Sequence, residues 1–225
     1  MKRIVRETKE TQIEIRIGVA KANEANKGAP GAGGSGLGGR VQVSTTLPFY
    51  DHMISTFARY AGFDLVLNAK GDLRHHIMED VALALGHAVR SITPKSAARY
   101  GERTIPMDDA LVQAVIDVGG RAFFVGKLPS RLYTHVLRSF ADAVGATLHV
   151  RVLRGEDRHH IIEAGFKATG LALRQALRET DAGIFSTKGQ VRLVEEEIEE
   201  AEEAFCGGGG GGSRAATDFS RGGDS

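Results

Sequence analysis

Residues 52–80, HMISTFARYAGFDLVLNAKGDLRHHIMED, recur in altered form as HVLRSFADAVGATLHVRVLRGEDRHHIIEA over residues 135–164. The two copies align with one residue of slack and share a Phe-Ala pair near the middle of the expected first helix. Gly62 and Gly145 stand where that helix should turn into a strand, and glycine there relieves the penalty on left-handed backbone. Both copies continue as an Ala/Leu-rich helix. A helix–strand–loop–helix unit is therefore written twice, which predicts an internal pseudo-twofold.

Apolar periodicity predicts a mixed fold around this repeat. Alternation with a period of two indicates strands at residues 12–17, 40–44, 64–67, 115–118, 123–125 and 147–152. A period near 3.6 indicates helices at residues 51–61, 76–91, 134–144 and 160–178. Because strands often follow one another directly, the pattern favours an α+β fold over a doubly wound parallel sheet.

The chain is expected to divide into two repeat halves and a tail. The first half takes residues 1–92 and includes a glycine-rich loop at 27–39, and the second takes residues 93–190. An acidic helix is expected at 191–206, and a disordered glycine-rich tail at 207–225. Within the loop, residues 31–36 spell G-x-G-x-x-G, but a strand-like segment follows in place of a helix. A dinucleotide site is therefore disfavoured.

Composition excludes several classes of protein. The net charge is +1, aromatic residues make up 6% and Trp is absent, which argues against nucleic-acid partners. No apolar run approaches the roughly 20 residues that span a bilayer, so no membrane partner is expected. The lone Cys206 excludes an intramolecular disulfide, and the charged N-terminus lacks the apolar stretch of a secretory signal. We expect a cytoplasmic protein.

The histidines are the chemically informative residues. Six of the eight occupy matched positions of the repeat, and each His-His pair is followed by a glutamate in the pattern His-His-x-x-Glu. The resulting candidate metal ligands are His52, His75, His76, Glu79, His135, His159, His160 and Glu163. A lone helical histidine is usually a surface or core residue, whereas a duplicated set of this kind favours metal binding. His87 and His149 have no counterpart, and no site role is expected for them.

The spacing of these ligands predicts how they are shared. Residues three or four apart lie on one helix face, so each glutamate can join a histidine of its own pair. Adjacent histidines diverge by about 100°, so each pair should serve two ions. Six imidazoles and two carboxylates make two sites, which suits Mn, Fe, Co, Ni or Zn and leaves positions open for substrate. One chain need not unite all eight ligands, so the sites are expected either within one chain or between subunits.

A second group of polar residues stands in glycine-bearing, loop-like segments. It comprises Arg99, Arg121, Ser186 and Lys188. Arginine offers bidentate contacts to phosphate and lysine a point charge, but isolated basic residues are usually solvated surface. By pattern alone this group is a weak candidate for a phosphate site.

Several motifs occur in one order that resembles the imidazoleglycerol-phosphate dehydratase family over roughly residues 3–190. They are RETKET at 6–11, FYDHM at 49–53, GFDL at 62–65, GD at 71–72, HHIMED at 75–80, RYG at 99–101, PMD at 106–108, LH at 148–149, HHIIE at 159–163, FK at 166–167 and STKG at 186–189. The resemblance implies two similar halves with four-stranded sheets packed on helices, a fold of the ribosomal protein S5 domain 2-like kind. It also implies an assembly of 24 subunits with two Mn²⁺ ions per active site at subunit contacts.

The resemblance also implies an activity and further roles. The family's metal ligands fall on the eight residues named above, and its substrate contacts fall on Glu10, Arg99, Arg121, Ser186 and Lys188, the last four holding the phosphate. The implied reaction converts imidazole glycerol phosphate to imidazole acetol phosphate, with the substrate ring held as imidazolate between two cations. Glu163, Glu79 and Glu10 all remain candidates for moving the proton.

Two other functions remain open. The alternatives are a multimeric metal-binding paralogue without the activity, and a dinuclear hydrolase acting on another phosphorylated metabolite. The four candidate phosphate-binding residues favour the dehydratase, because metal storage needs no phosphate clamp.

Two residues depart from the family pattern. Arg74 stands where the family usually has Asp, and Tyr60 where it usually has His. Neither departure removes a ligand.

Overall fold

The same order of elements, three strands, a helix, a strand and a helix, occurs twice in the computed structural model, which describes residues 1–20 and 39–181. The first run consists of β1 (Lys2–Glu7), β2 (Thr11–Val19), β3 (Val41–Ser44), α1 (Pro48–Ala61), β4 (Phe63–Gly71) and α2 (Arg74–Ile92). The second consists of β5 (Tyr100–Met107), β6 (Ala110–Asp117), β7 (Phe123–Gly126), α3 (Arg131–Val144), β8 (Thr147–Arg154) and α4 (Arg158–Ala176). The duplicated α+β fold expected from the sequence is confirmed.

Each run forms one four-stranded sheet with the same topology. The orders are β1-β2-β4-β3 and β5-β6-β8-β7, and in both sheets only the last pair, β3–β4 or β7–β8, is parallel. In the first sheet Ile15 pairs with Leu67 and Ile17 with Leu65, and all four side chains are fully buried. Alternate residues therefore face the core, as period-two alternation requires.

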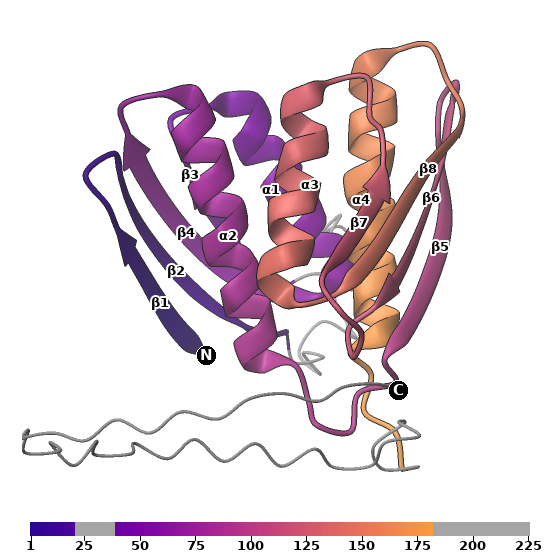
Figure 1. Ribbon diagram of the computed structural model, residues 1–225, viewed down its shortest axis with the longest axis horizontal. Helices are drawn as coiled ribbons and strands as arrows, with labels where there is room; N and C mark the ends of the chain where they lie inside the picture. Colours follow the sequence, from indigo (N-terminus) through magenta and orange to yellow (C-terminus); the bar gives the residue numbers. More distant parts are fainter. Residues whose placement is uncertain (21–38, 182–225) are drawn as a thin grey trace, which may run out of the picture. The chain divides into compact units, whose positions relative to one another are not determined.

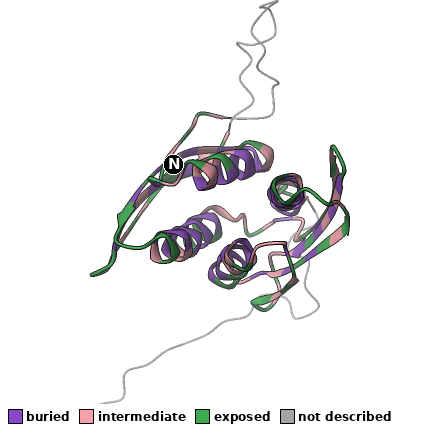
Figure 2. Cartoon of the chain, turned by 90° about the horizontal axis from the view of Figure 1, so that it is seen from above, coloured by how far each residue is buried: buried purple, intermediate pink, exposed green. Residues whose placement is uncertain are grey.

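The four helices lie between the two sheets (Figures 1 and 2). Their buried sides face one another and the sheets, so the two halves share a single core. Helices pack across the halves: α2 lies against α3, and α1 lies against α4. This crossed pairing decides which residues of one repeat meet those of the other.

Matched glycines permit the close helix contacts. A Cβ on Gly170 of α4 would lie 2.7 Å from the carbonyl oxygen of Phe57 in α1. A Cβ on Gly86 of α2 would lie 2.7 Å from the carbonyl oxygen of Phe140 in α3. Each position therefore needs the absence of a side chain, and the contact is the same in both halves.

The turns that end α1 and α3 are also matched. Gly62 and Gly145 adopt φ values of 77° and 76°, and their backbone N–H groups bond to carbonyls of the last helical turn. The repeat predicted this glycine with left-handed backbone at the end of each helix.

The second half also has side-chain caps at the beginnings of its helices. The oxygens of Ser130 and Asp157 accept hydrogen bonds from backbone N–H groups in the first turns of α3 and α4.

Strands β1 and β5 were absent from the sequence expectations. Both lie at sheet edges, and β1 alternates half-buried and exposed residues in a strongly charged sequence, KRIVRE. Charge on an edge strand hides the apolar alternation, because one side of the strand has no neighbour.

Three expected segments lie outside the described residues: the loop at 27–39, except for Gly39, the acidic helix at 191–206 and the tail at 207–225. Among the described helices, none has the length and apolar character to cross a bilayer.

Candidate functional site

Two sets of three side chains, each with two histidines and one glutamate, lie close together. In the first set, Nε2 of both His75 and His135 lies 3.3 Å from Oε2 of Glu79. Within each set, the three possible ligand atoms lie within 4.8 Å of one another. Six of the eight predicted ligands are thus brought together in threes.

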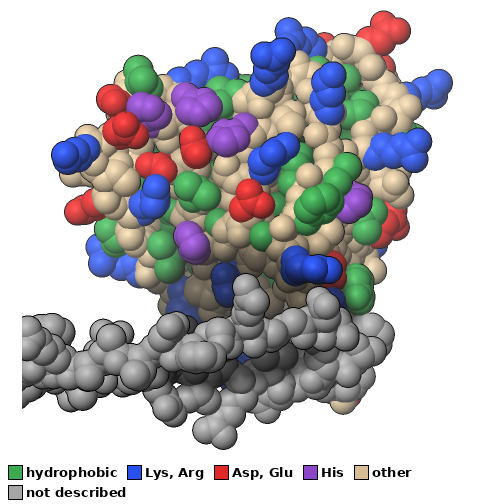
Figure 3. Space-filling view, in the orientation of Figure 1, with side chains coloured by type: hydrophobic (Ala, Val, Ile, Leu, Met, Phe, Trp, Pro, Cys, Tyr) green, Lys and Arg blue, Asp and Glu red, His purple; other side chains and the backbone are tan. Residues whose placement is uncertain are grey.

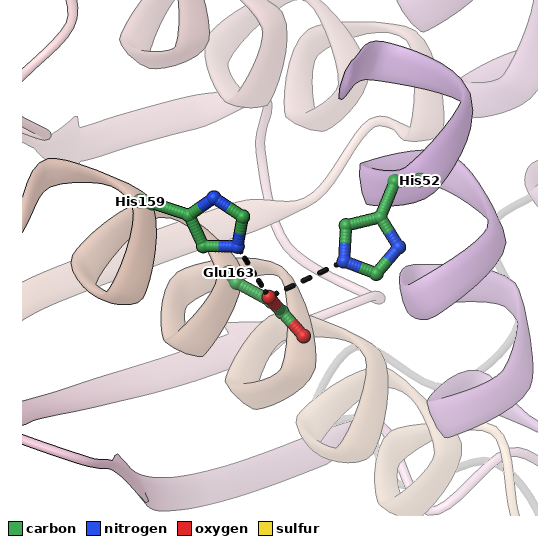
Figure 4. Close-up of side chains that lie close together, drawn as sticks. All are labelled: His52, His159 and Glu163. Carbon is green, nitrogen blue, oxygen red and sulfur yellow. Dashed lines mark hydrogen bonds and ion pairs between the residues drawn. The ribbon is translucent and has the colours of Figure 1, made fainter. Parts of the chain in front are cut away.

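The second set has the same form (Figure 4). His159 Nε2 lies 3.0 Å and His52 Nε2 3.3 Å from Oε2 of Glu163. His159 and Glu163 are four residues apart on α4, and His52 reaches them from α1. Because α1 packs on α4 and α2 on α3, each set takes its third residue from the other half of the chain.

The two glutamates differ in their surroundings. The Glu163 side chain is 8% exposed, and its Oε1 lies 3.0 Å from Nζ of Lys167, whereas the Glu79 side chain is 36% exposed. Burial raises the pKa of Glu163, but the ammonium of Lys167 and the two imidazoles outweigh it, so that this pKa lies below its usual range. Lys167 was not predicted as a site residue. Its position four residues after Glu163, on the same face of the helix, could have indicated it.

The remaining two histidines turn away from these sets. His76 Nδ1 lies 2.8 Å from Asp72 and 3.5 Å from Glu10, and His160 Nδ1 lies 2.7 Å from Asp109. Within each His-His pair the ring planes are inclined by 77° and 82°. The geometry agrees with the expectation that adjacent histidines diverge, while ligation itself stays a prediction.

Carboxylates hold the outer histidines in a defined orientation. The backbone N–H of Glu156, the His160 ring and the N–H of Asp157 lower the pKa of Asp109, so this group is an acceptor. The hydrogen bond to Asp109 in turn raises the pKa of His160. A bond at Nδ1 leaves Nε2 as the nitrogen that could bind an ion, the arrangement common around protein-bound metals. In His160 this Nε2 lies 3.4 Å from Asp108 Oδ2. Sequence reasoning missed the roles of Asp72 and Asp109.

All six histidines lie at one end of the molecule, where the helices begin. Figure 3 shows histidine side chains gathered with acidic ones near the start of α2 and α3. Arg99 and Arg121 lie at the opposite end. The N–H of Arg99 donates to the carbonyl of Ala176 at the last residue of α4, a helix of 19 residues, or about 28 Å. The carbonyl of Arg121 accepts from Thr147, the first residue of β8.

Two predicted phosphate contacts therefore lie far from the histidines of the same chain, while Glu10 lies beside them. Arg99 has a φ of 74° and its guanidinium donates to Asp117 over 2.7 and 3.0 Å. Its orientation is thus fixed by a two-bond ion pair. Ser186 and Lys188 lie outside the described residues.

Comparison with known proteins identifies the family. Residues 45–173 match the sequence model of imidazoleglycerol-phosphate dehydratase. Among curated proteins, imidazoleglycerol-phosphate dehydratases of Dictyoglomus thermophilum and Acetivibrio thermocellus are 40% and 38% identical, each over 84% of this chain and 97% of the relative. The chain belongs to the imidazoleglycerol-phosphate dehydratase family.

Solved structures of this family support the assignment. The crystal structure of the Pyrococcus furiosus enzyme in complex with (S)-C348 matches with a TM-score of 0.69 and 34% identity, over 84% of this chain and 100% of that chain. That of the Staphylococcus aureus imidazoleglycerol-phosphate dehydratase matches with a TM-score of 0.64 and 26% identity, over 80% and 100%. The fold expected from the family resemblance is therefore confirmed.

The donor atoms of this dehydratase-family chain fit a transition-metal ion. Two imidazole nitrogens and one carboxylate oxygen meet in each set, a combination that suits divalent first-row metals. Among the described side chains, the buried Nε2 atom of His135 makes no hydrogen bond, although Glu79 Oε2 lies 3.3 Å away. A buried nitrogen without a hydrogen bond is costly, and coordination to an ion held between this nitrogen and the carboxylate would satisfy it.

Proposed function

We propose that this protein is a lyase of histidine biosynthesis that dehydrates imidazole glycerol phosphate to imidazole acetol phosphate. The observation that carries the proposal is the pair of matched sets, each with two histidines and one glutamate, in a chain of the dehydratase family. The named activity of relatives that align over nearly their whole length supports the same conclusion.

The metal ligands we propose are the eight residues of the two repeats. His75, Glu79 and His135 would hold one ion and His52, His159 and Glu163 the other, with His76 and His160 completing sites on other copies of the chain. We propose Mn²⁺, two per active site. When bound, such ions would supply a Lewis acid that draws electrons into the substrate's imidazole ring.

The position of Glu10 favours it as the group that moves the substrate proton. Glu79 and Glu163 each face two imidazole nitrogens of their own sets, and a carboxylate used as a ligand is occupied. Glu10 belongs to neither set, its side chain is 54% exposed, and its Oε2 lies 3.5 Å from His76. A carboxylate beside the metal ligands and open to the substrate can accept a proton.

The phosphate would be held by Arg99, Arg121, Ser186 and Lys188 of another copy. Arg99 and Arg121 lie at the far end of their own chain from its histidines, a separation that no small phosphorylated substrate bridges. This separation supports a homo-oligomer, for which the family resemblance suggests 24 subunits. A cytoplasmic location is part of the proposal and is supported by the single cysteine.

The test compares Mn²⁺-loaded wild type with His75→Ala and His159→Ala. We expect wild type to dehydrate imidazole glycerol phosphate, and both variants to lose metal and at least about 100-fold in activity because a ligand is missing. His149→Ala, an exposed histidine of β8 without a repeat counterpart, is the control and should match wild type. An assembled, metal-loaded wild type that forms no product would refute the dehydratase proposal. Variants with normal metal content would refute the ligand assignment.

A further inference from the structure

Two further side chains, one on α1 and one on α4, lie next to the Glu163 set, further along the same helices. On α1, Tyr60 follows His52 by two turns, and on α4, Lys167 follows Glu163 by one turn. The Lys167 ammonium lies 5.7 Å from the centre of the Tyr60 ring, within the range of a cation–π contact. Helices α1 and α4 therefore make a second side-chain contact, between Tyr60 and Lys167, beyond the contact of His52 with Glu163.

Lys167 is held on three sides. Its Nζ lies 3.0 Å from Oε1 of Glu163, donates to the sulfur of Met107 at 3.4 Å, and faces the ring of Tyr60. Its side chain is only 17% exposed. The thioether is a weak acceptor, so the carboxylate and the ring are the contacts that can hold the ammonium in place.

The backbone fixes Tyr60 over α4. A Cβ on Gly170 would lie 3.1 Å from Cβ of Tyr60 and 2.7 Å from the carbonyl of Phe57, so α1 and α4 touch at this glycine. A side chain that leaves α1 here must extend along the surface of α4. Helix packing thus sets where the Tyr60 side chain starts, and the ring lies beside Lys167 of α4.

The other half of the molecule lacks this arrangement. At the matched helix contact, a Cβ on Gly86 would lie 2.6 Å from Cβ of Ala143, so Ala143 occupies the place of Tyr60. The residue four positions after Glu79 is Leu83, where the second half has Lys167. The Glu79 set therefore has neither the cation nor the ring, and the two otherwise similar sets differ by one positive charge.

We infer that Tyr60 is a positioning residue: its ring holds the Lys167 ammonium against Glu163 and so makes the two histidine–glutamate sets chemically unequal. This inference rests on the proposed function for its activity measurement. The ring is what matters, because a cation–π contact needs the aromatic face and not the hydroxyl.

The first test separates the ring from the hydroxyl. In assembled, Mn²⁺-loaded protein, Tyr60→Leu should lower kcat/KM about threefold to tenfold, while Tyr60→Phe should stay within about twofold of wild type. Phe124→Leu removes a half-buried ring that faces Arg138 at 5.9 Å elsewhere in the molecule, and it should leave kcat/KM unchanged. Equal losses for Tyr60→Phe and Tyr60→Leu, or no loss in either, would overturn the inference.

A double-mutant cycle tests whether Tyr60 acts through Lys167. In a Lys167→Met background, Tyr60→Leu should have no further effect on kcat/KM, because the ammonium that the ring holds is gone. An undiminished effect in that background would show that Tyr60 acts by another route. Metal content should match wild type in Tyr60→Leu, since neither histidine nor Oε2 of Glu163 is altered.

A second measurement does not depend on catalysis. Amine acetylation followed by mass spectrometry should label Lys167 about threefold to tenfold faster in Tyr60→Leu than in wild type or Tyr60→Phe, with the exposed Lys127 as internal reference. An unchanged labelling rate would overturn the inference even if the enzyme is active. A faster rate in a protein without dehydratase activity would uphold it and refute the proposed function alone.

Discussion

Glu163 shows what a buried carboxylate requires in this protein. Its side chain is almost fully buried, and it lies next to the ammonium of Lys167 and the imidazoles of His52 and His159. A buried charge without partners is strongly unfavourable, so the site is built to keep this carboxylate ionised. Glu79 lies in the matched place with more exposure and no lysine, and it depends on its two histidines and the proposed ion.

Replacing either glutamate should remove one ion. We expect Glu79→Gln and Glu163→Gln each to lower the metal-to-chain ratio by about half, because a neutral amide is a poor ligand for a divalent ion. Elemental analysis after dialysis against Mn²⁺ measures the ratio. Glu102→Gln, on the exposed side of β5, is the control. Two variants that retain the wild-type ratio would contradict the assignment.

Asp117 should couple stability to pH through Arg99. Burial raises the pKa of Asp117, but the Arg99 guanidinium and the Gly119 N–H bring it below its usual range. A depressed pKa contributes stability above the unfolded value of about 3.9, and that stability is lost as pH falls through the folded pKa. We therefore expect Asp117→Asn to unfold about 1–3 kcal/mol more easily than wild type at pH 7.

The pH dependence distinguishes this contribution from a general loss of packing. The difference in unfolding free energy between wild type and Asp117→Asn should shrink as the pH falls below about 4, because the wild-type carboxyl is then protonated too. Denaturant unfolding at several pH values measures it. Asp142→Asn, exposed on α3, should show no such trend. A difference that is constant with pH would contradict the role of the ion pair.

At the scale of elements, crossed helix pairing creates the sets. Each glutamate shares a helix with one histidine, and the neighbouring helix of the other half supplies the second. Gly86 and Gly170 set the separation of the paired helices, and each stands seven residues after the glutamate of its set. These glycines therefore set how closely the paired helices approach, and with it the distance between each glutamate and the histidine on the neighbouring helix.

Alanine at these glycines should disturb the packing. We expect Gly86→Ala and Gly170→Ala each to lower the free energy of unfolding by about 1–3 kcal/mol, because the new methyl group would meet backbone at 2.7 Å. Gly165 on the same helix α4 is the matched control, since its Cβ would meet only side chains at ordinary contact distances, Leu128 at 3.4 Å and Val112 at 4.0 Å. Gly165→Ala should be neutral, or stabilise by up to about 1 kcal/mol through its helix propensity. Denaturant titration compares the three, and equal effects would contradict the packing explanation.

At the scale of the whole molecule, the histidines and the arginines occupy opposite ends. Arg99 lies at the end of α4 and His159 at its beginning, so one substrate cannot contact both in one chain. The proposed active site therefore needs a second copy. The proposed function would then depend on assembly as well as on the fold of the single chain.

Mixed assemblies test this dependence. His159→Ala and Arg99→Ala should each be inactive alone. When they are dissociated, mixed in equal amounts and reassembled, up to about a quarter of the sites should combine intact histidines from one variant with an intact arginine from the other. Recovered activity of that order supports sites shared between chains. Mixtures that remain inactive while wild type regains activity after the same treatment would contradict it.

The sequence alone determined the repeat, the α+β class and the identity of the candidate ligands. These depend on local regularities: apolar periodicity, glycine at the ends of α1 and α3, and the spacing of His-His-x-x-Glu within one helix. The sequence did not predict the edge strands β1 and β5, because strands with an unpaired side carry charges that obscure the apolar alternation.

Only the tertiary structure decided which residues share a set. The sequence could not tell that His135 joins Glu79 and that His52 joins Glu163, because the crossing depends on which helices pack together. Nor could it reveal that Lys167 and Tyr60 meet beside one set while Leu83 and Ala143 occupy the matched places beside the other. Contacts between residues far apart in the chain arise from packing, which no local pattern encodes. The repeat thus supplies matched candidate ligands, and helix packing places them in two sets with different neighbours.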